Sequence, residues 1–236
     1  MNLMEKINLQ KIKIAGLLIT VGVLGSILLH DLFNSIGNPM STNGFPLDVF
    51  FVIAAVSLFA GMLLGKYYAL FVPLCVIAIS DVFRVIVDPT TAMYWTTSLF
   101  LFTWSGYAII ALLGSVIKRK DTRTRSFVPL LMGAGVLGVI IYDLWTNFGF
   151  WLGYSKLGFY PQTLGGLSTV FIAGIPSTVW HLLSTSIAIA CVAVPLLYLR
   201  KQELLSKNLT IKPIEKYVVI SATVVLMSAS ILSTLV

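Results

Sequence analysis

The sequence contains little charge and little cysteine. Of its 236 residues, 11% are charged and 58% are hydrophobic, whereas soluble domains average about 25% charged and about 45–50% apolar residues. So few charged side chains cannot cover a water-facing surface, which excludes a cytosolic enzyme and a disordered chain. Cys75 and Cys191 each lie in an apolar run without a second cysteine nearby, which excludes a disulfide-linked secreted scaffold.

Long apolar runs are present instead of charge. Runs of about 20 residues suit helices that cross a hydrocarbon core ~30 Å thick, whereas a β-barrel shows alternating segments of about 10 residues. We therefore predict an all-α polytopic membrane protein in the cell membrane. The predicted spans are Ile14–Phe33, Leu47–Gly65, Tyr67–Val87, Met93–Ile117, Phe127–Phe148, the long region Gly166–Leu199, and Tyr217–Leu235.

These spans divide the chain into four predicted parts: a cytoplasmic N-terminus (1–13), a six-span membrane core (14–199), a basic cytoplasmic loop (200–216) and an additional C-terminal span (217–236). Within the sixth region, Pro176 lacks an amide hydrogen and disfavours helix at the preceding residue. We expect a short partial helix at Leu167–Gly174 and a crossing that starts near Ser177. A broken helix suits a binding site, and a simple kink is the alternative.

The basic residues predict the orientation of the spans. Counting from a cytoplasmic N-terminus, 14 of the 16 Lys and Arg residues fall on the inner side, and only Arg84 and Lys156 fall on the outer half. This distribution follows the positive-inside rule and places the C-terminus outside. The net charge of +7 therefore indicates topology and attraction to membrane lipid, and we expect no nucleic-acid partner.

Several ionisable and aromatic residues fall in the predicted outer half. Such groups are costly within spans and usually face a cavity or one another, so we predict that they form a substrate-binding pocket. The alternatives are a structural Asp81–Arg84 ion pair, because these residues are three apart on a helix, and an interfacial aromatic belt. The predicted substrate-binding residues are Asp81, Arg84, Asp143, Trp145, Asn147, Trp151, Tyr160 and His181.

We find no catalytic constellation and predict that the chain is not an enzyme. No histidines or carboxylates have metal-ligand spacing, so we expect no metal site and no cofactor. Small residues at packing intervals, among them Gly22, Gly25 and Ser26, allow close helix contact either within the chain or with a partner.

An ordered series of motifs extends from about Leu47 to Leu199. It includes Leu58-Phe59-Ala60-Gly61, Val72-Pro73-Leu74 with Ser80-Asp81, Thr146 to Leu152 (TNFGFWL), Tyr160 to Leu164 (YPQTL) with Gly166-Leu167, and Ala173-Gly174-Ile175-Pro176. This series resembles an uncharacterised prokaryotic membrane family that is grouped with the substrate-binding S-components of energy-coupling-factor (ECF) transporters. The stretch from Asn147 to Pro176 is the most specific part.

The resemblance implies a six-helix S-component-like bundle with an outward-opening pocket for a vitamin or metal ion. It also implies docking on an ECF T-component through small residues of the first helix, here Gly22, Gly25 and Ser26, with two cytoplasmic ATPases supplying energy. The seventh span is additional to that fold. The alternative hypothesis is a non-catalytic structural or accessory subunit that associates with other subunits of a larger membrane complex.

Overall fold

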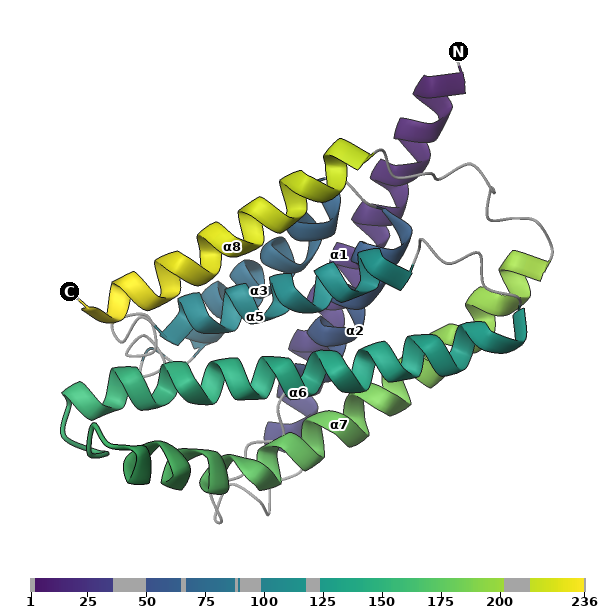
Figure 1. Ribbon diagram of the computed structural model, residues 1–236. Helices are drawn as coiled ribbons and strands as arrows, with labels where there is room; N and C mark the ends of the chain where they lie inside the picture. The colour runs from purple at the N-terminus through teal and green to yellow at the C-terminus, as the bar shows by residue number, and fades with distance from the viewer. Residues whose placement is uncertain are drawn as a thin grey trace.

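The described part of the protein is entirely helical. The computed structural model describes residues 3–35, 50–64, 67–87, 89, 99–117, 124–201 and 213–235, and these residues form seven helices and no strand (Figure 1). The helices are α1 (Leu3–Ser35), α2 (Phe50–Leu63), α3 (Tyr68–Val87), α5 (Leu99–Ile117), α6 (Thr124–Lys156), α7 (Leu164–Lys201) and α8 (Pro213–Leu235).

Five helical stretches in these ranges are long and apolar enough to cross a membrane: Leu9–Leu28, Tyr68–Val87, Leu99–Ile117, Val128–Lys156 and Leu164–Cys191. A shorter apolar helix covers Val52–Leu63. The prediction of an all-α, multi-pass membrane protein is confirmed at this level. The six-plus-one arrangement of spans, the identity of the membrane and the orientation of the termini stay predictions.

The helix boundaries agree best with prediction where hydropathy changes sharply. The third predicted span, Tyr67–Val87, corresponds to α3. By contrast, α6 continues to Lys156, well beyond the predicted end at Phe148, and α1 begins at Leu3, inside the predicted cytoplasmic segment. Residues 93–98 of the fourth predicted span and 202–212 of the predicted basic loop lie outside the described residues.

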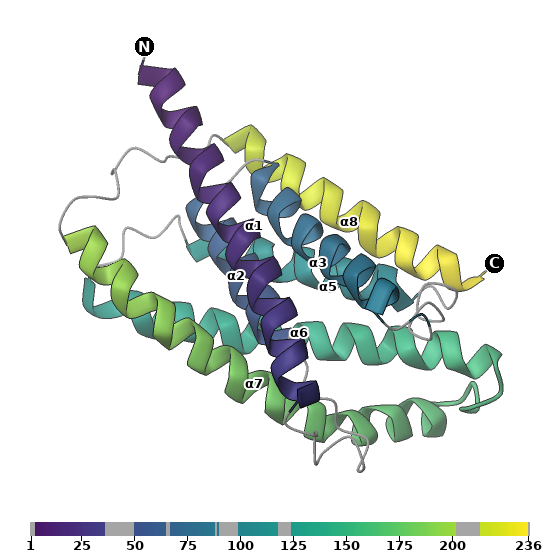
Figure 2. The same cartoon turned by 180° about the vertical axis from the view of Figure 1, so that it is seen from behind.

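The predicted break at Pro176 is wrong. The helix α7 continues through Leu164–Lys201 over 38 residues, and both views show it changing direction part-way along (Figures 1 and 2). A proline removes one backbone hydrogen bond and commonly bends a helix. The helix continues past Pro176, so the break is excluded and the simple kink that the sequence left open stays the prediction for this residue.

The centre of the bundle is the crossing of α2 and α5. A Cβ atom added at Gly61 would overlap the carbonyl oxygen of Ala111, and one added at Gly114 would overlap the carbonyl oxygen of Leu58. Each helix therefore places a glycine against the backbone of the other, the close approach that small residues permit in membranes. Around this crossing, α1 packs on α2 and α3, and α8 packs on α5 (Figure 2).

The helices α6 and α7 form a long antiparallel hairpin beside this centre (Figure 1). Half of the α5 span is buried, whereas only 11% of the α7 span is buried. Exposed apolar side chains recur along α7, including Ile172, Val179 and Leu183. In a membrane protein such residues face lipid or a partner, so their exposure is consistent with the bilayer environment.

Candidate functional site

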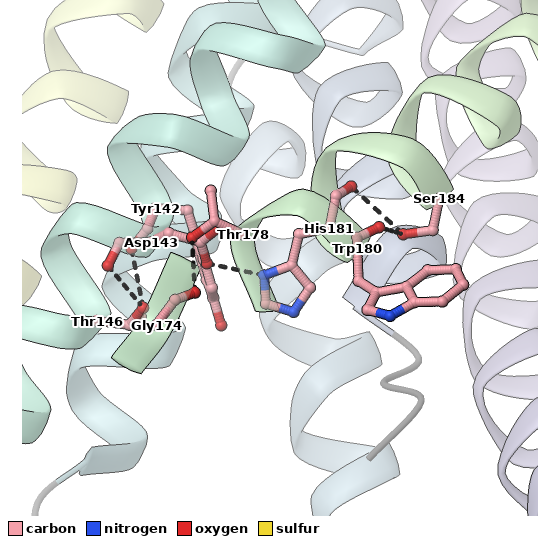
Figure 3. A network of polar contacts seen from close by, with 8 residues as sticks. All are labelled: Tyr142, Asp143, Thr146, Gly174, Thr178, Trp180, His181 and Ser184. Atoms are coloured by element: carbon pink, nitrogen blue, oxygen red, sulfur yellow. Dashed lines mark hydrogen bonds and ion pairs between the residues drawn. The ribbon is translucent and has the colours of Figure 1, made fainter. Parts of the chain in front are cut away.

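The hairpin contains a polar pair in which one partner is buried and the other is partly buried. Atom Nδ1 of His181, on α7, lies 2.8 Å from Oδ1 of Asp143, on α6, and Figure 3 shows the imidazole directed toward the carboxylate. Asp143 is 5% exposed. With the carboxylate ionised, Nδ1 must carry the proton and donate it, because an ionised carboxylate only accepts hydrogen bonds. The sequence had placed both residues in one site, and the structure brings these two together.

The second oxygen of this carboxylate has no hydrogen-bond partner. Oδ2 of Asp143 is buried and unpaired within the described structure. A buried acceptor without a donor costs about 1–3 kcal/mol, and more when it is charged. An unpaired acceptor of this kind calls for a specific explanation.

Basic side chains are scarce around the pair. Between Val128 and Cys191 the only residue of the types Lys and Arg is Lys156, which is exposed and lies 13 residues from Asp143, about 20 Å along the helix. The helices α2 and α5, which pack on α6, contain no charged residue. Within these segments, His181 is the one group able to carry a positive charge that lies within hydrogen-bond distance of Asp143.

The other polar side chains near the pair bond to the backbone or pack against the facing helix. Oγ1 of Thr146 lies 3.0 Å from the carbonyl of Tyr142, and Oγ1 of Thr178 lies 3.2 Å from the carbonyl of Gly174, so both hydroxyls donate to backbone carbonyls (Figure 3). The side-chain amide of Asn147 packs directly on Gly174, where an added Cβ would lie 2.5 Å from Nδ2. Gly174 therefore lets a third polar residue of α6 lie against α7.

One residue that the sequence analysis missed belongs to this interface. Thr185 is 3% exposed, and its Oγ1 is buried without a partner. It follows His181 by one helical turn, so both lie on the same face of α7. The four-residue spacing from His181 was the signal available in the sequence, whereas the burial of Thr185 depends on how the two helices pack.

The turn that joins α6 to α7 is well defined by hydrogen bonds. The amide of Gly158 donates to the carbonyl of Ser155 and the amide of Phe159 donates to the carbonyl of Tyr154, both at 3.1 Å. This pair of bonds is a Schellman motif, and Gly158 has the positive φ of +80° that it requires. The rings of Tyr154 and Phe159, 5.5 Å apart, supply the accompanying apolar contact.

Side chains stabilise the other half of the turn. Nε1 of Trp151 donates to the carbonyl of Pro161 at 3.1 Å, which ties α6 to the connecting loop. Oγ1 of Thr163 accepts a hydrogen bond from the amide of Gly166 at 3.2 Å, so Thr163 is the N-cap of α7. Trp151, a predicted substrate-binding residue, thus has a structural contact at the end of the hairpin.

Aromatic rings continue from this turn along the hairpin. The centroids of Trp145 and Phe148 are 6.3 Å apart, those of Phe148 and Trp151 are 5.9 Å apart, and those of Phe150 and Tyr160 are 6.0 Å apart. Such separations favour ring–ring contact. Trp145 and Trp151 therefore belong to one group of rings with Phe148, and Tyr160 belongs to a second group with Phe150.

Trp145 also joins the hairpin to α5 and α8. Its Nε1 donates to Oγ of Ser105 at 2.8 Å, and that hydroxyl lies 3.0 Å from Oγ of Ser230 on α8. Three helices are therefore linked through one buried serine. Ser105 and Ser230 could not be singled out from the sequence, since isolated serines occur throughout the spans.

Asp81 and Arg84 lie on α3, which packs on α1, α2 and α5. Asp81 is buried, and its Oδ2 accepts a hydrogen bond from Nε1 of Trp104 on α5 at 3.2 Å. Arg84 is half-buried. The contact with Trp104 directs Asp81 toward α5 rather than toward His181. That Asp81 and Arg84 share a site with Asp143 stays a prediction.

The predicted docking residues lie along α1. A Cβ added at Gly22 would lie 2.8 Å from Val76, and one added at Gly25 would lie 3.1 Å from Val52, so both glycines face α2 and α3 within the chain. Ser26 is 3% exposed, and its hydroxyl has no partner in the described structure. Their use in docking a partner stays a prediction, and their close contacts in this structure are internal.

A family model matches residues 6–209. The chain belongs to the family of unknown function DUF6580. The matched stretch of this DUF6580 protein begins within α1, includes α2 to α7 and ends before α8 begins at Pro213. No curated protein matches the chain, and no solved structure matches it.

The motifs that carry the family resemblance have a clear place in the fold. The stretch from Asn147 to Pro176 forms the end of α6, the capped turn and the first part of α7. Within it, the glycine at 158 permits the turn and the glycine at 174 admits Asn147. The specific part of the sequence thus encodes the end of the hairpin, next to the Asp143–His181 pair.

Proposed function

We propose that this protein is a membrane transport component that captures a small solute, similar in role to an ECF S-component, at a site between α6 and α7. The observation that carries the proposal is the Asp143–His181 pair, with Nδ1 and Oδ1 2.8 Å apart, in the stretch 128–191 where the only other charged residue is Lys156. Ionisable residues within spans are rare and typically mark substrate or ion pathways.

The energetic cost of burying this pair favours a role in function over a role in stability. A buried ion pair is often no more stable than apolar residues of similar volume. Here one carboxylate oxygen also lacks a donor, which adds a further cost. An arrangement with that cost is expected where a ligand supplies the missing interaction.

The aromatic side chains at the end of the hairpin support a ligand-binding role for this part of the protein. Pockets for small molecules combine apolar and aromatic walls with a few placed polar groups. In this proposal Trp151 and Tyr160 supply the aromatic surface, while Asp143, Asn147 and His181 supply the polar groups. Trp145 donates to Ser105 on α5 and lies two residues from Asp143, on another side of α6, so its contact with the solute stays a prediction. We keep Asp81 and Arg84 as a proposed second set of polar contacts with the solute. They lie on α3, where Asp81 bonds to Trp104 of α5.

Transport against a gradient needs an energy source outside this site. The sequence has no nucleotide-binding loop, so we propose that a T-component with ATPases, or an ion gradient, drives the cycle. In this proposal Gly22, Gly25 and Ser26 contribute to docking after a movement of α1, the N-terminus is cytoplasmic and the C-terminus is outside. The role requires no enzymatic step.

The experiment is uptake by the full chain in proteoliposomes or in cells, with labelled vitamins, amines and metal ions. Asp143→Asn keeps the shape of the side chain and removes its charge, so we expect it to abolish uptake of the solute. Ser184→Ala is the matched control, because the Ser184 hydroxyl already donates to the carbonyl of Trp180 at 2.7 Å. Equal uptake by Asp143→Asn and the unmodified protein would refute the site.

A structural subunit of a larger membrane complex is the second candidate. It is favoured by the Ser105–Ser230 contact, which fixes the additional helix α8 to the bundle, and by polar groups that bond to one another. Purification from native membranes distinguishes the two proposals. Co-purification with other complex subunits and without an ATPase would favour the structural role.

A further inference from the structure

We infer that the Asp143–His181 site takes a small protonated amine, a cation with N–H donors of the ammonium class. The inference rests on the proposed function and names the chemical class of its solute. It follows from what the buried groups lack: Oδ2 of Asp143 and Oγ1 of Thr185 are both buried and both without a partner in the described structure.

The register of the hairpin places these atoms on one interface. Ile189 of α7 contacts the position of Gly135 on α6, and His181 contacts Asp143. Thr185 lies midway between His181 and Ile189, four residues from each, so it is on the same face of α7. Thr185 therefore faces α6 one helical turn from the Asp143–His181 pair, in the direction of Gly135.

The charge balance selects a cation. When His181 is neutral, the pair carries one negative charge that no Lys or Arg on α2, α5 or the 128–191 stretch offsets nearby. A single positive charge restores neutrality, and charge-assisted hydrogen bonds to a carboxylate are the strong ones. An anionic solute would add to the negative charge at this point.

The hydrogen bonds that the two unpaired oxygens lack favour an amine over other cations. Oδ2 needs a donor, and the hydroxyl of Thr185 accepts as well as donates. An ammonium group presents several N–H donors and one positive charge from a small centre, so it matches what Oδ2 of Asp143 lacks, and Thr185 one turn away supplies a second acceptor. Among the described residues no group of three His, Cys, Asp or Glu side chains is placed to hold a metal ion, so the donor set is better matched to an amine.

The test measures binding to the full chain in detergent or nanodiscs by calorimetry. Methylammonium and ammonium are the probes, sodium is the metal-cation comparison, and tetramethylammonium, which has no N–H, keeps the ionic strength constant. We expect methylammonium to bind and sodium and tetramethylammonium not to bind. Asp143→Asn should weaken binding more than about tenfold, the value of a hydrogen bond to a charged group.

Two further variants keep the test independent of the folding of Asp143→Asn. Thr185→Val removes the unpaired hydroxyl and should weaken methylammonium binding by about two- to tenfold. Ser184→Ala, at the neighbouring position, removes a hydroxyl that is already bonded to the backbone and should leave binding unchanged. Equal effects of Thr185→Val and Ser184→Ala would overturn the inference.

Other outcomes separate this inference from the proposed function. Sodium binding that depends on Asp143, without amine binding, overturns the amine assignment. Uptake of a different solute that Asp143→Asn leaves intact overturns the inference and leaves a transport role standing. Methylammonium binding with the expected variant pattern, but no uptake in any system, supports the amine site and refutes transport.

Discussion

Two helix pairs in this protein make close contact by different means. In the α2–α5 crossing, glycines bring two backbones together among apolar side chains, with Gly61 against Ala111 and Gly114 against Leu58. In the α6–α7 hairpin, polar side chains meet in the interface, and two of their oxygens remain unpaired. The α2–α5 crossing is therefore a packing scaffold, whereas the α6–α7 hairpin contains polar groups that helix packing alone does not require.

The contrast indicates where substitutions harm the fold and where they harm function. At the α2–α5 crossing, any added side-chain volume should destabilise the protein. In the α6–α7 hairpin, removal of the polar groups together should be tolerated by the fold. The following predictions test that difference, beginning with the largest effect.

Gly61→Val should have the largest effect on folding. The added side chain meets the carbonyl of Ala111, which is backbone, so the cost should reach or exceed the upper end of the about 1–3 kcal/mol seen for overpacked side chains. The yield of monodisperse protein by size-exclusion chromatography measures it. Gly133→Val is the matched control, because nothing lies within 4 Å of a Cβ at Gly133; equal yields of the two variants would contradict the scaffold role.

His181→Leu should destabilise the protein by about 3 kcal/mol, because it leaves the Asp143 carboxylate buried without its partner. The double variant Asp143→Leu/His181→Leu should recover to within about 1 kcal/mol of the unmodified protein, since apolar replacements of buried pairs are often neutral. Unfolding free energies in mixed micelles give both values. A double variant as unstable as His181→Leu would show that the pair is needed for folding.

Gly158→Ala should destabilise the hairpin turn by about 1–2 kcal/mol, because a residue with a Cβ is strained at a φ of +80°. The same measurement on Gly165→Ala serves as a comparison, since an added Cβ there meets only Oγ1 of Thr163 at 3.7 Å. If the two variants unfold alike, the capped turn contributes little.

Ser230→Ala should have the smallest effect, about 0.6 kcal/mol, which is the average for an interhelical hydrogen bond in a membrane protein. It removes the contact with Ser105 and should loosen α8 without affecting solute binding. Ser115→Ala, whose hydroxyl donates to the carbonyl of Leu112 at 2.7 Å, should be closer to neutral. A loss of solute binding in Ser230→Ala would place α8 in the site.

The sequence predicted the features that depend on composition and local hydropathy. The helical class and the α3 boundaries follow from the abrupt change between apolar and polar residues near Tyr68 and Val87. The extension of α6 to Lys156 was missed because its last turns are rich in glycine and aromatic residues rather than aliphatic ones. The break predicted at Pro176 was wrong, because loss of one hydrogen bond bends a 38-residue helix without ending it.

The candidate site was predictable only in part. Asp143 and His181 stood out because ionisable residues are costly in apolar helices, and their pairing needed only the antiparallel hairpin. The bond between Trp104 and Asp81 and the burial of Thr185 depend on helix rotation and tertiary packing. A hydropathy pattern does not contain that information.

The most direct test of the central claim is an experimental structure of the full chain purified from its native membrane. If the Asp143–His181 pair is a solute site, density for a non-protein group should lie about 3 Å from Oδ2 of Asp143, between α6 and α7. The contradicting result is an Oδ2 that accepts a hydrogen bond from another side chain of this protein, in an interface filled by apolar residues.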